Sequence, residues 1–237
     1  MTALLDLRSV SFFRHLETNP HGTRGRLRSA VRQQRNVISE ITLRVNAGER
    51  VGILGANGAG KTTLLRLMAG IFKPDRGHIE RIGQVSTFLD GGYGLDLHQT
   101  GRENAQTRLI LARVRKSERQ PLLRAIEEFA DLKEYFDQPV RSYSAGMLLR
   151  LIFAIGTVGE HEILLVDEGL GTADLGFQAK AVNRINEMFA SAPIVVLASH
   201  NLAMLREVCV RGVVIESGTV LFDGDIEDAI RKSKELI

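Results

Sequence analysis

The sequence contains a single cysteine, Cys209, among its 237 residues. One cysteine cannot form an internal disulfide, and it leaves no second thiolate for a metal site. No apolar run approaches the roughly 18 residues of a membrane-spanning helix, and the N-terminus lacks the basic and apolar segments of a secretion signal. These absences favour a cytosolic protein in which Cys209 packs in the core.

Neither sign of charge dominates the composition. Hydrophobic residues make up 44% and charged residues 25%, the net charge is +3, and the length suits one large domain or a domain with an insertion. The positive charge is concentrated between Arg14 and Asn36, where Glu17 is the one acid. The arginines there are Arg14, Arg24, Arg26, Arg28, Arg32 and Arg35. Two interpretations stay open: a solvated loop, or a short basic element near phospholipid headgroups.

The strongest motif is a nine-residue glycine-rich segment that fits a phosphate-binding loop. It consists of Gly55, Ala56, Asn57, Gly58, Ala59, Gly60, Lys61, Thr62 and Thr63. An apolar strand is predicted at 50–54 and a helix at 62–69, which is the context that the motif requires. The glycines allow backbone N–H groups to converge on an anion, and the helix N-terminus adds partial positive charge. We expect Lys61 to reach the β- and γ-phosphates of a nucleotide and the Thr62 hydroxyl to ligate magnesium.

A second motif is the apolar run 163–166, which ends in Asp167 and Glu168. Parallel strands deliver their carboxyl ends to the ligand crevice of an α/β sheet, so both carboxylates are expected beside the phosphates. Asp167 suits the magnesium shell. Glu168 suits a base that polarises the attacking water.

The rest of the chain alternates strands and helices. Apolar runs at 163–166 and 194–197, with a helical stretch at 174–189 between them, predict buried parallel strands and an α/β fold. Helices are expected over 101–136, where Ser117 and Gln120 are spaced as a capping box, and after Ser144 as an N-cap. Further strands are expected at 4–13, 38–45, 78–82, 85–88, 212–216 and 220–222, and a last helix from about 225.

The segment Ser144, Ala145, Gly146 and Met147 occupies the position of the signature motif in the ATP-binding subunits of ABC transporters, which this chain resembles from Leu4 to about Gly224. With Tyr143 before it, the segment is similar to the branch that exports bacterial polysaccharides such as O-antigen, capsule and teichoic acid. The resemblance implies a P-loop NTPase core, RecA-like, with an N-terminal antiparallel β region and an inserted helical subdomain. It implies one nucleotide-binding domain over 1–237, with the core at about 1–93 and 158–237, the helical subdomain at about 94–157 and a basic insertion at 14–36.

The resemblance also assigns further residues to the site. A serine hydroxyl and a glycine at a helix N-terminus can grip the γ-phosphate of a nucleotide bound to another subunit. Asp174 stands at the position of the D-loop, and His200 at that of the switch histidine, which holds the attacking water. Asp90 stands where most ABC ATPases have a glutamine, and we expect it to meet the metal. Phe12 and Phe13 are both candidates to stack on adenine.

The expected function is ATP hydrolysis that powers export of a lipid-linked bacterial polysaccharide across the inner membrane, with ATP and Mg²⁺ as cofactors. The expected partners are a polytopic membrane permease and a second copy of the chain, at the cytoplasmic face of the membrane and without nucleic acid. An alternative is a soluble ABC-type ATPase that acts on ribosomes or DNA. A non-hydrolysing nucleotide switch is a further rival, against which Glu168 and His200 both speak.

Overall fold

A computed structural model describes residues 2–17, 32–88, 94–159, 161–167 and 175–236. Its main sheet has six strands, of which the first five in spatial order are parallel and the sixth pairs antiparallel at the edge. In that order they are β5 (Val85–Phe88), β6 (Ile163–Val166), β7 (Ile194–Ala198), β3 (Arg50–Leu54), β8 (Arg211–Glu216) and β9 (Thr219–Asp225). The α/β fold expected from the apolar runs is therefore confirmed.

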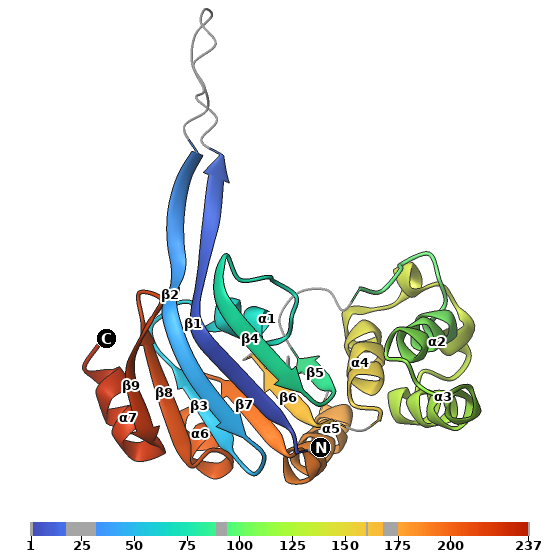
Figure 1. Cartoon of the computed structure of the whole chain (residues 1–237). Coiled ribbons are helices and arrows are strands. Elements are labelled where there is room, and N and C mark those ends of the chain that lie inside the picture. Colours follow the sequence, from blue (N-terminus) through green and yellow to red (C-terminus); the bar gives the residue numbers. More distant parts are fainter. Residues whose placement is uncertain (1, 18–31, 89–93, 160, 168–174, 237) are drawn as a thin grey trace, which may run out of the picture.

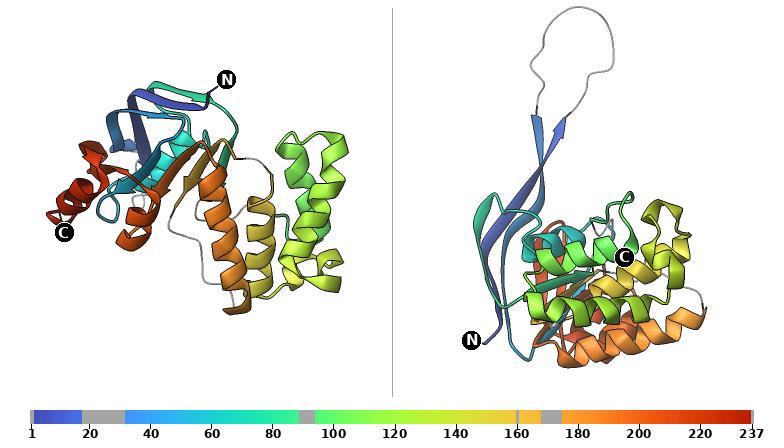
Figure 2. Two further views of the ribbon diagram at one scale, coloured as in Figure 1. Left: turned by 90° about the horizontal axis from the view of Figure 1, so that it is seen from below. Right: turned by 90° about the vertical axis from the view of Figure 1, so that its right-hand side faces the viewer.

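A second sheet has the antiparallel order β2-β1-β4. It contains β1 (Leu4–Glu17), β2 (Arg32–Asn46) and β4 (Arg76–Ile82). The pairing of β1 with β4 ends at Ser11, whereas β1 and β2 stay paired as far as Glu17 and Arg32. The far ends of β1 and β2 therefore form a two-stranded arm that projects from the body (Figures 1 and 2).

The arm differs from what the sequence pattern predicts. The pattern predicts one strand that ends at 13 and another that begins at 38, with a loop or a short amphipathic element in the arginine-rich stretch between them. Arg14, Arg32 and Arg35 instead lie within paired strands. Cross-strand hydrogen bonding extends both strands past their apolar residues, which local hydrophobic pattern cannot reveal. The other three arginines of the stretch, at 24, 26 and 28, lie outside the described residues.

Two cores flank the main sheet. Helix α1 (Lys61–Met68) buries Leu64, Leu65 and Leu67 in one core that includes side chains from both sheets. On the opposite face, α5 (Leu175–Ser191), α6 (Leu202–Val208) and α7 (Ile226–Lys234) contribute to the second core. Cys209 lies there, 2% exposed, and burial raises the pKa of its thiol to about 12. The expectation that this cysteine packs in the core is confirmed.

A third core belongs to a group of helices beside the sheet (Figure 1). These are α2 (Gly101–Leu111), α3 (Lys116–Ala130), α4 (Ala145–Gly156) and the 3₁₀ helices η1 (Lys133–Asp137) and η2 (Val140–Ser142). Phe177 of α5 packs into this core and so connects it to the sheet. In Figure 2 these helices and α7 lie at opposite ends of the molecule.

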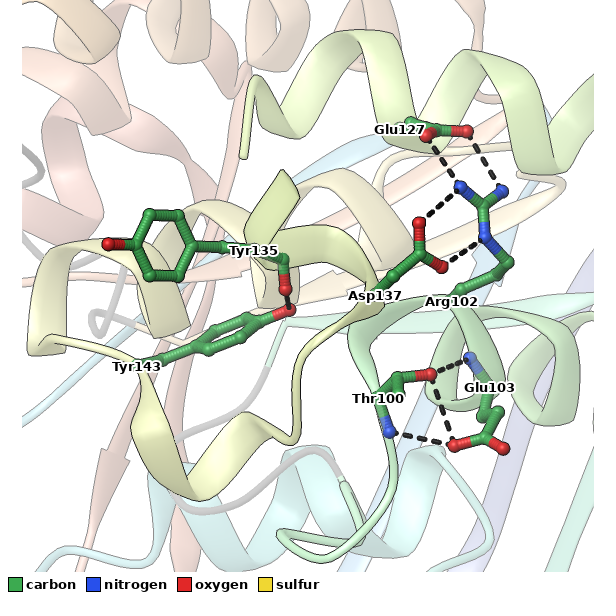
Figure 3. A network of polar contacts seen from close by, with 7 residues as sticks. All are labelled: Thr100, Arg102, Glu103, Glu127, Tyr135, Asp137 and Tyr143. Carbon is green, nitrogen blue, oxygen red and sulfur yellow. Dashed lines mark hydrogen bonds and ion pairs between the residues drawn. The ribbon is translucent and has the colours of Figure 1, made fainter. Parts of the chain in front are cut away.

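The helix starts of this group both support and correct the predictions. The predicted N-cap at Ser144 is confirmed, since its Oγ accepts a hydrogen bond from Met147 N at 3.2 Å. The capping box predicted at Ser117 is wrong, because α3 begins at Lys116 and its N-cap is Arg115, two residues before Ser117. The capping box instead lies at α2, where Thr100 and Glu103 exchange hydrogen bonds (Figure 3).

Candidate functional site

A large cavity, of about 840 Å³, lies where the carboxyl ends of β6 and β7 and the loop after β3 meet the root of the arm. This volume is in the range of small-molecule sites. The lining includes the whole loop from Ala56 to Thr63, together with Asp167 and His200. The remaining lining residues are Arg14, Arg35, Asn36, Val37, Ile215, Glu216, Ser217 and Leu236.

Glycine is required at both ends of the phosphate loop. Gly55 has φ of 145°, and a Cβ there would lie 2.2 Å from the backbone oxygen of Ile215. Gly60 has φ of 111°, and a Cβ there would lie 2.9 Å from Ile38 Cδ1 and 3.0 Å from the Val37 oxygen. Other residues rarely adopt these angles and would also collide with β2 and β8. The loop is therefore packed directly against the root of the arm.

The ammonium of Lys61 is held across the loop. Its Nζ donates to the backbone oxygens of Gly55 at 2.8 Å and Ala56 at 3.2 Å, and lies 3.4 Å from His200 Nε2. The residue is 9% exposed. A cation held beside the convergent N–H groups of the loop and the N-terminus of α1 makes this end of the cavity suited to a polyphosphate.

Two strand ends bring polar groups to the same cavity. Asp167 follows β6, is 5% exposed, and its backbone N–H donates to the Phe88 oxygen at 2.7 Å. His200 follows β7, and the next residue, Asn201, caps α6 through hydrogen bonds from Ala203 N and Met204 N. Parallel strands thus deliver both side chains to the phosphate loop, as expected.

The oxygen donors of Thr62 and Asp167 fit magnesium, which typically takes one or two protein ligands and completes its shell with water and substrate phosphates. The described part of the chain holds no group of three or more His, Cys, Asp or Glu side chains suited to a metal. Three further site predictions, Asp90, Glu168 and Asp174, lie outside the described residues.

The signature residues line a different cavity. This second cavity has a volume of about 420 Å³ and is lined by Ser144, Gly146, Met147 and Arg150 of α4 and by residues 131–135. It shares no lining residue with the first cavity. Ala145 is exposed at the start of the same helix. Within one chain, the structure does not bring the signature segment to the phosphate loop.

A network of polar contacts lies beside the start of α4, the helix that carries the signature segment (Figure 3). Tyr143, which precedes Ser144, donates its hydroxyl to the Tyr135 oxygen at 2.6 Å. Arg102 pairs with Glu127 at 2.6 Å and with Asp137 at 2.6 Å, and its hydrogen bond to Asp137 lowers the pKa of that carboxyl. These contacts fix α2, α3 and η1 to one another next to α4.

Phe12 and Phe13, the two candidates to stack on adenine, make their aromatic contacts elsewhere. Phe12 stacks on Phe72 with ring centroids 5.2 Å apart, and Phe13 lies under the guanidinium of Arg76 at 5.6 Å. Neither lines the large cavity. Sequence reasoning instead missed Arg14 and Arg35, which do line it; their positions opposite each other on the two strands become evident only from the pairing register.

A phosphate loop between a parallel strand and a helix, with an acid at the end of another parallel strand of the same sheet, defines a P-loop nucleotide hydrolase. Residues 38–171 match the family model "ABC transporter". The chain is 40% identical to the O-antigen export system ATP-binding protein RfbE of Yersinia enterocolitica, over 77% of each chain. It is 37% identical to the corresponding protein RfbB of Klebsiella pneumoniae, over 84% of this chain and 80% of that protein. The chain belongs to the ABC transporter family and is an ATPase.

More distant relatives agree with this assignment. The teichoic acids export ATP-binding protein TagH of Listeria innocua is 32% identical over 84% of this chain, which spans 59% of that protein. A solved ATP-binding subunit of an ABC transporter superposes with a TM-score of 0.74 at 22% identity, covering 98% of this chain and 94% of that one. A dimeric ATP-binding cassette bound to ADP and phosphate gives 0.70 at 18% identity, over 94% and 98%. The P-loop fold is therefore confirmed.

Proposed function

We propose that this chain is the ATP-hydrolysing subunit of an exporter that moves a lipid-linked bacterial polysaccharide across the inner membrane. The observation that carries the proposal is its 40% identity, over 77% of the chain, to a protein named as an O-antigen export system ATP-binding protein. The Tyr143–Met147 form of the signature segment supports the same branch. No relative reported above is named for work on ribosomes or DNA, so the alternative has no support from the comparisons.

The site residues divide the work by position. Lys61 and the loop N–H groups would neutralise the β- and γ-phosphates. Thr62 and Asp167 would hold a magnesium ion, which would supply further positive charge at the transferred phosphoryl group. Glu168 orients and deprotonates the attacking water. His200, whose ring lies 3.4 Å from Lys61 Nζ, is placed to donate to the γ-phosphate. Asp90 adds an acid toward the metal.

We further propose that two copies of the chain form the working ATPase. Because the signature cavity is separate from the phosphate loop within one chain, the signature can meet a nucleotide only across an interface. Ser144 to Met147 of one copy would then contact the γ-phosphate held by the other copy, with Asp174 beside the interface. A dimeric cassette of the same fold supports this arrangement.

A polytopic permease is proposed as the other partner. No helix in the described part of the chain is long and apolar enough to cross a bilayer. In the proposed exporter the permease would provide the translocation path, and this subunit would act at the cytoplasmic face of the inner membrane. Nucleic acid is not expected as a partner.

Chromosomal replacement of the wild-type chain by Glu168→Gln tests the function. The substitution keeps the shape of the side chain and removes its charge, so ATP should still bind while turnover falls by roughly 10²–10⁴. Surface polysaccharide should disappear and its lipid-linked form should accumulate inside the cell, with both reversed by the wild-type gene. Normal surface polysaccharide together with loss of ATPase activity would refute the export role and keep the ATPase.

A further inference from the structure

The end of the large cavity away from Lys61 has no aromatic lining residue among the residues that the structure describes. A nucleotide whose phosphates occupy the loop must place its base against the remaining walls, which are the arm, the β8–β9 turn and Leu236. Stacking on a purine needs a flat group of matching size. In this part of the lining, the flat cationic groups are the guanidinium groups of Arg14 and Arg35.

The register of the arm explains why these two side chains face the cavity. Arg14 pairs directly with Arg35, and the preceding pair on the same face of β1 is Phe12 with Ile38. Phe12 and Ile38 belong to the core between the sheets, so the arginines occupy the next position outward on that inner face. Phe13 points to the opposite face, where it meets Arg76.

Val37 is the extra residue that this register requires. Phe12 of β1 pairs with Ile38 and the next residue, Phe13, pairs with Asn36. Val37 has no partner on β1 and is therefore a bulge on β2. Val37 and Ile38 also contact the phosphate loop at Gly60, as the short distances from a Cβ at Gly60 demonstrate. The arginine pair is therefore anchored next to the loop and does not depend on the far end of the arm.

The pair is electrostatically unfavourable in the absence of a ligand. Like charges directly opposite each other on antiparallel strands destabilise the pairing. Within the described residues, neither guanidinium forms a hydrogen bond or ion pair, and both are exposed. A guanidinium can stack on an aromatic ring and is only weakly hydrated, so an electron-rich ring lying against the pair would offset the repulsion.

We propose that Arg14 and Arg35 form the base-binding wall of the ATP site, with a guanidinium plane stacked on the adenine ring where an aromatic side chain was expected. The proposal rests on the assignment of this cavity as the ATP site. It makes the nucleotide a link between the phosphate loop and the arm.

The test compares two probes on the full-length chain by calorimetry: MgATP, and magnesium tripolyphosphate, which has the phosphates without a base. Arg14→Ala combined with Arg35→Ala should weaken MgATP binding by roughly ten-fold or more, the usual effect of losing one stacked base. Tripolyphosphate affinity should change by less than about three-fold at physiological salt, where exposed charges are screened. The single substitutions then assign the stacking to one arginine.

Replacement residues separate stacking from charge. In the Arg35→Ala background, Arg14→Tyr should keep most of the MgATP affinity, whereas Arg14→Lys should behave as Arg14→Ala. In the Arg14→Ala background, Arg35→Tyr and Arg35→Lys make the same comparison for Arg35. Arg44→Ala is the matched control, since Arg44 is an exposed arginine of β2 outside the cavity lining. Thermal unfolding of each variant checks that the fold is retained.

Three results would overturn the proposal: equal loss for both probes, rescue by Lys but not by Tyr, or unchanged MgATP affinity in the double variant. The first two would assign the arginines to the phosphates, and the third would remove the arm from the site. Lys61→Ala distinguishes these results from failure of the site itself. It should weaken both probes, and unchanged binding of both would contradict the ATP-site assignment rather than the role of the arm.

Discussion

At the scale of single residues, the buried side chains of Lys61 and His161 have different roles, one in binding and one in stability. Lys61 is nearly buried yet bonded to the carbonyl oxygens of its own loop, so its charge is positioned in advance for an incoming phosphate. His161 is also nearly buried, but it lies just before β6, outside the ATP cavity, and its Nδ1 is 2.8 Å from Ser86 Oγ. It ties the start of β6 to β5, and its contribution is to stability.

His161 should make the stability of the protein depend on pH. Burial lowers the pKa of His161 below its ordinary value, and the positive charge of Arg184 acts in the same direction. The unfolded chain therefore binds this proton more tightly than the folded chain, so the free energy of unfolding falls as pH drops below about 6.5. Above that pH the contribution is complete. Below the lowered folded pKa it stops changing.

Urea denaturation between pH 5 and 8 measures this effect. His161→Asn retains a polar group near Ser86 and removes the titration, so the free energy of unfolding of the variant should vary less between pH 5 and 7 than that of the wild type. Equal slopes for the two proteins would mean that His161 remains accessible to protons in the folded state.

At the scale of elements, the support of α4 depends on close packing at Gly101. A Cβ at this first residue of α2 would lie 2.5 Å from Tyr143 Oη and 3.1 Å from the Phe136 oxygen. Gly101→Ala should therefore cost about 1–3 kcal/mol in the free energy of unfolding, as overpacking does. Because Tyr143 directly precedes Ser144, displacement of its ring should also lower ATP turnover while ATP binding at the phosphate loop is retained.

A double-mutant cycle with Tyr143→Phe checks this explanation. Tyr143→Phe removes the oxygen that lies nearest to the added methyl group, so Gly101→Ala should be less destabilising in that background. An equal cost in both backgrounds would show that the strain is set by the Phe136 backbone instead.

The elements that sequence reasoning predicted well are those with a strong local signal. The strands at 50–54, 85–88 and 163–166 agree with β3, β5 and β6, since short apolar runs in a parallel sheet need no long-range information. Ser117 and Thr100 both fit the four-residue pattern of a capping box. Only tertiary contacts distinguish them: Asn104, on the first turn of α2, bonds to the Asp96 and Thr100 oxygens and fixes that helix start.

The residues of the candidate site also fall into those that a sequence rule predicts and those that it does not. Convergence of Lys61, Asp167 and His200 follows from the rule that parallel strands present their carboxyl ends to one crevice, and the structure places all three at one cavity. The position of Arg14 and Arg35 depends on a bulge at Val37 and on strand pairing beyond the apolar residues. Neither feature is encoded in the hydrophobic pattern, so that pattern does not indicate the two arginines.

At the scale of the whole molecule, Gly146 has no evident reason within one chain to be a glycine. A Cβ at Gly146 would meet no atom within 4 Å, and the residue lies in the first turn of α4 with no left-handed backbone angle. Inside a single subunit, alanine would be at least as favourable there, since glycine costs about 0.5–1 kcal/mol relative to alanine in a helix. The open space is therefore where a second body is expected to approach, which in the proposed dimer is the nucleotide of the other copy.

Mixing two single variants, Gly146→Leu and Lys61→Ala, tests that geometry. Each variant alone should be inactive: Gly146→Leu should still bind ATP but block approach of the partner, and Lys61→Ala should lose the phosphate contact. Each ATP site of the proposed dimer takes its loop from one copy and its signature from the other. When the two proteins are mixed, one of the two sites in each mixed dimer therefore has both an intact loop and an intact signature. ATP turnover should then reappear on mixing and rise with the fraction of mixed dimer, measured by size-exclusion chromatography of differently tagged copies. A mixture that forms mixed dimers yet stays as inactive as its two components would contradict a site shared between subunits.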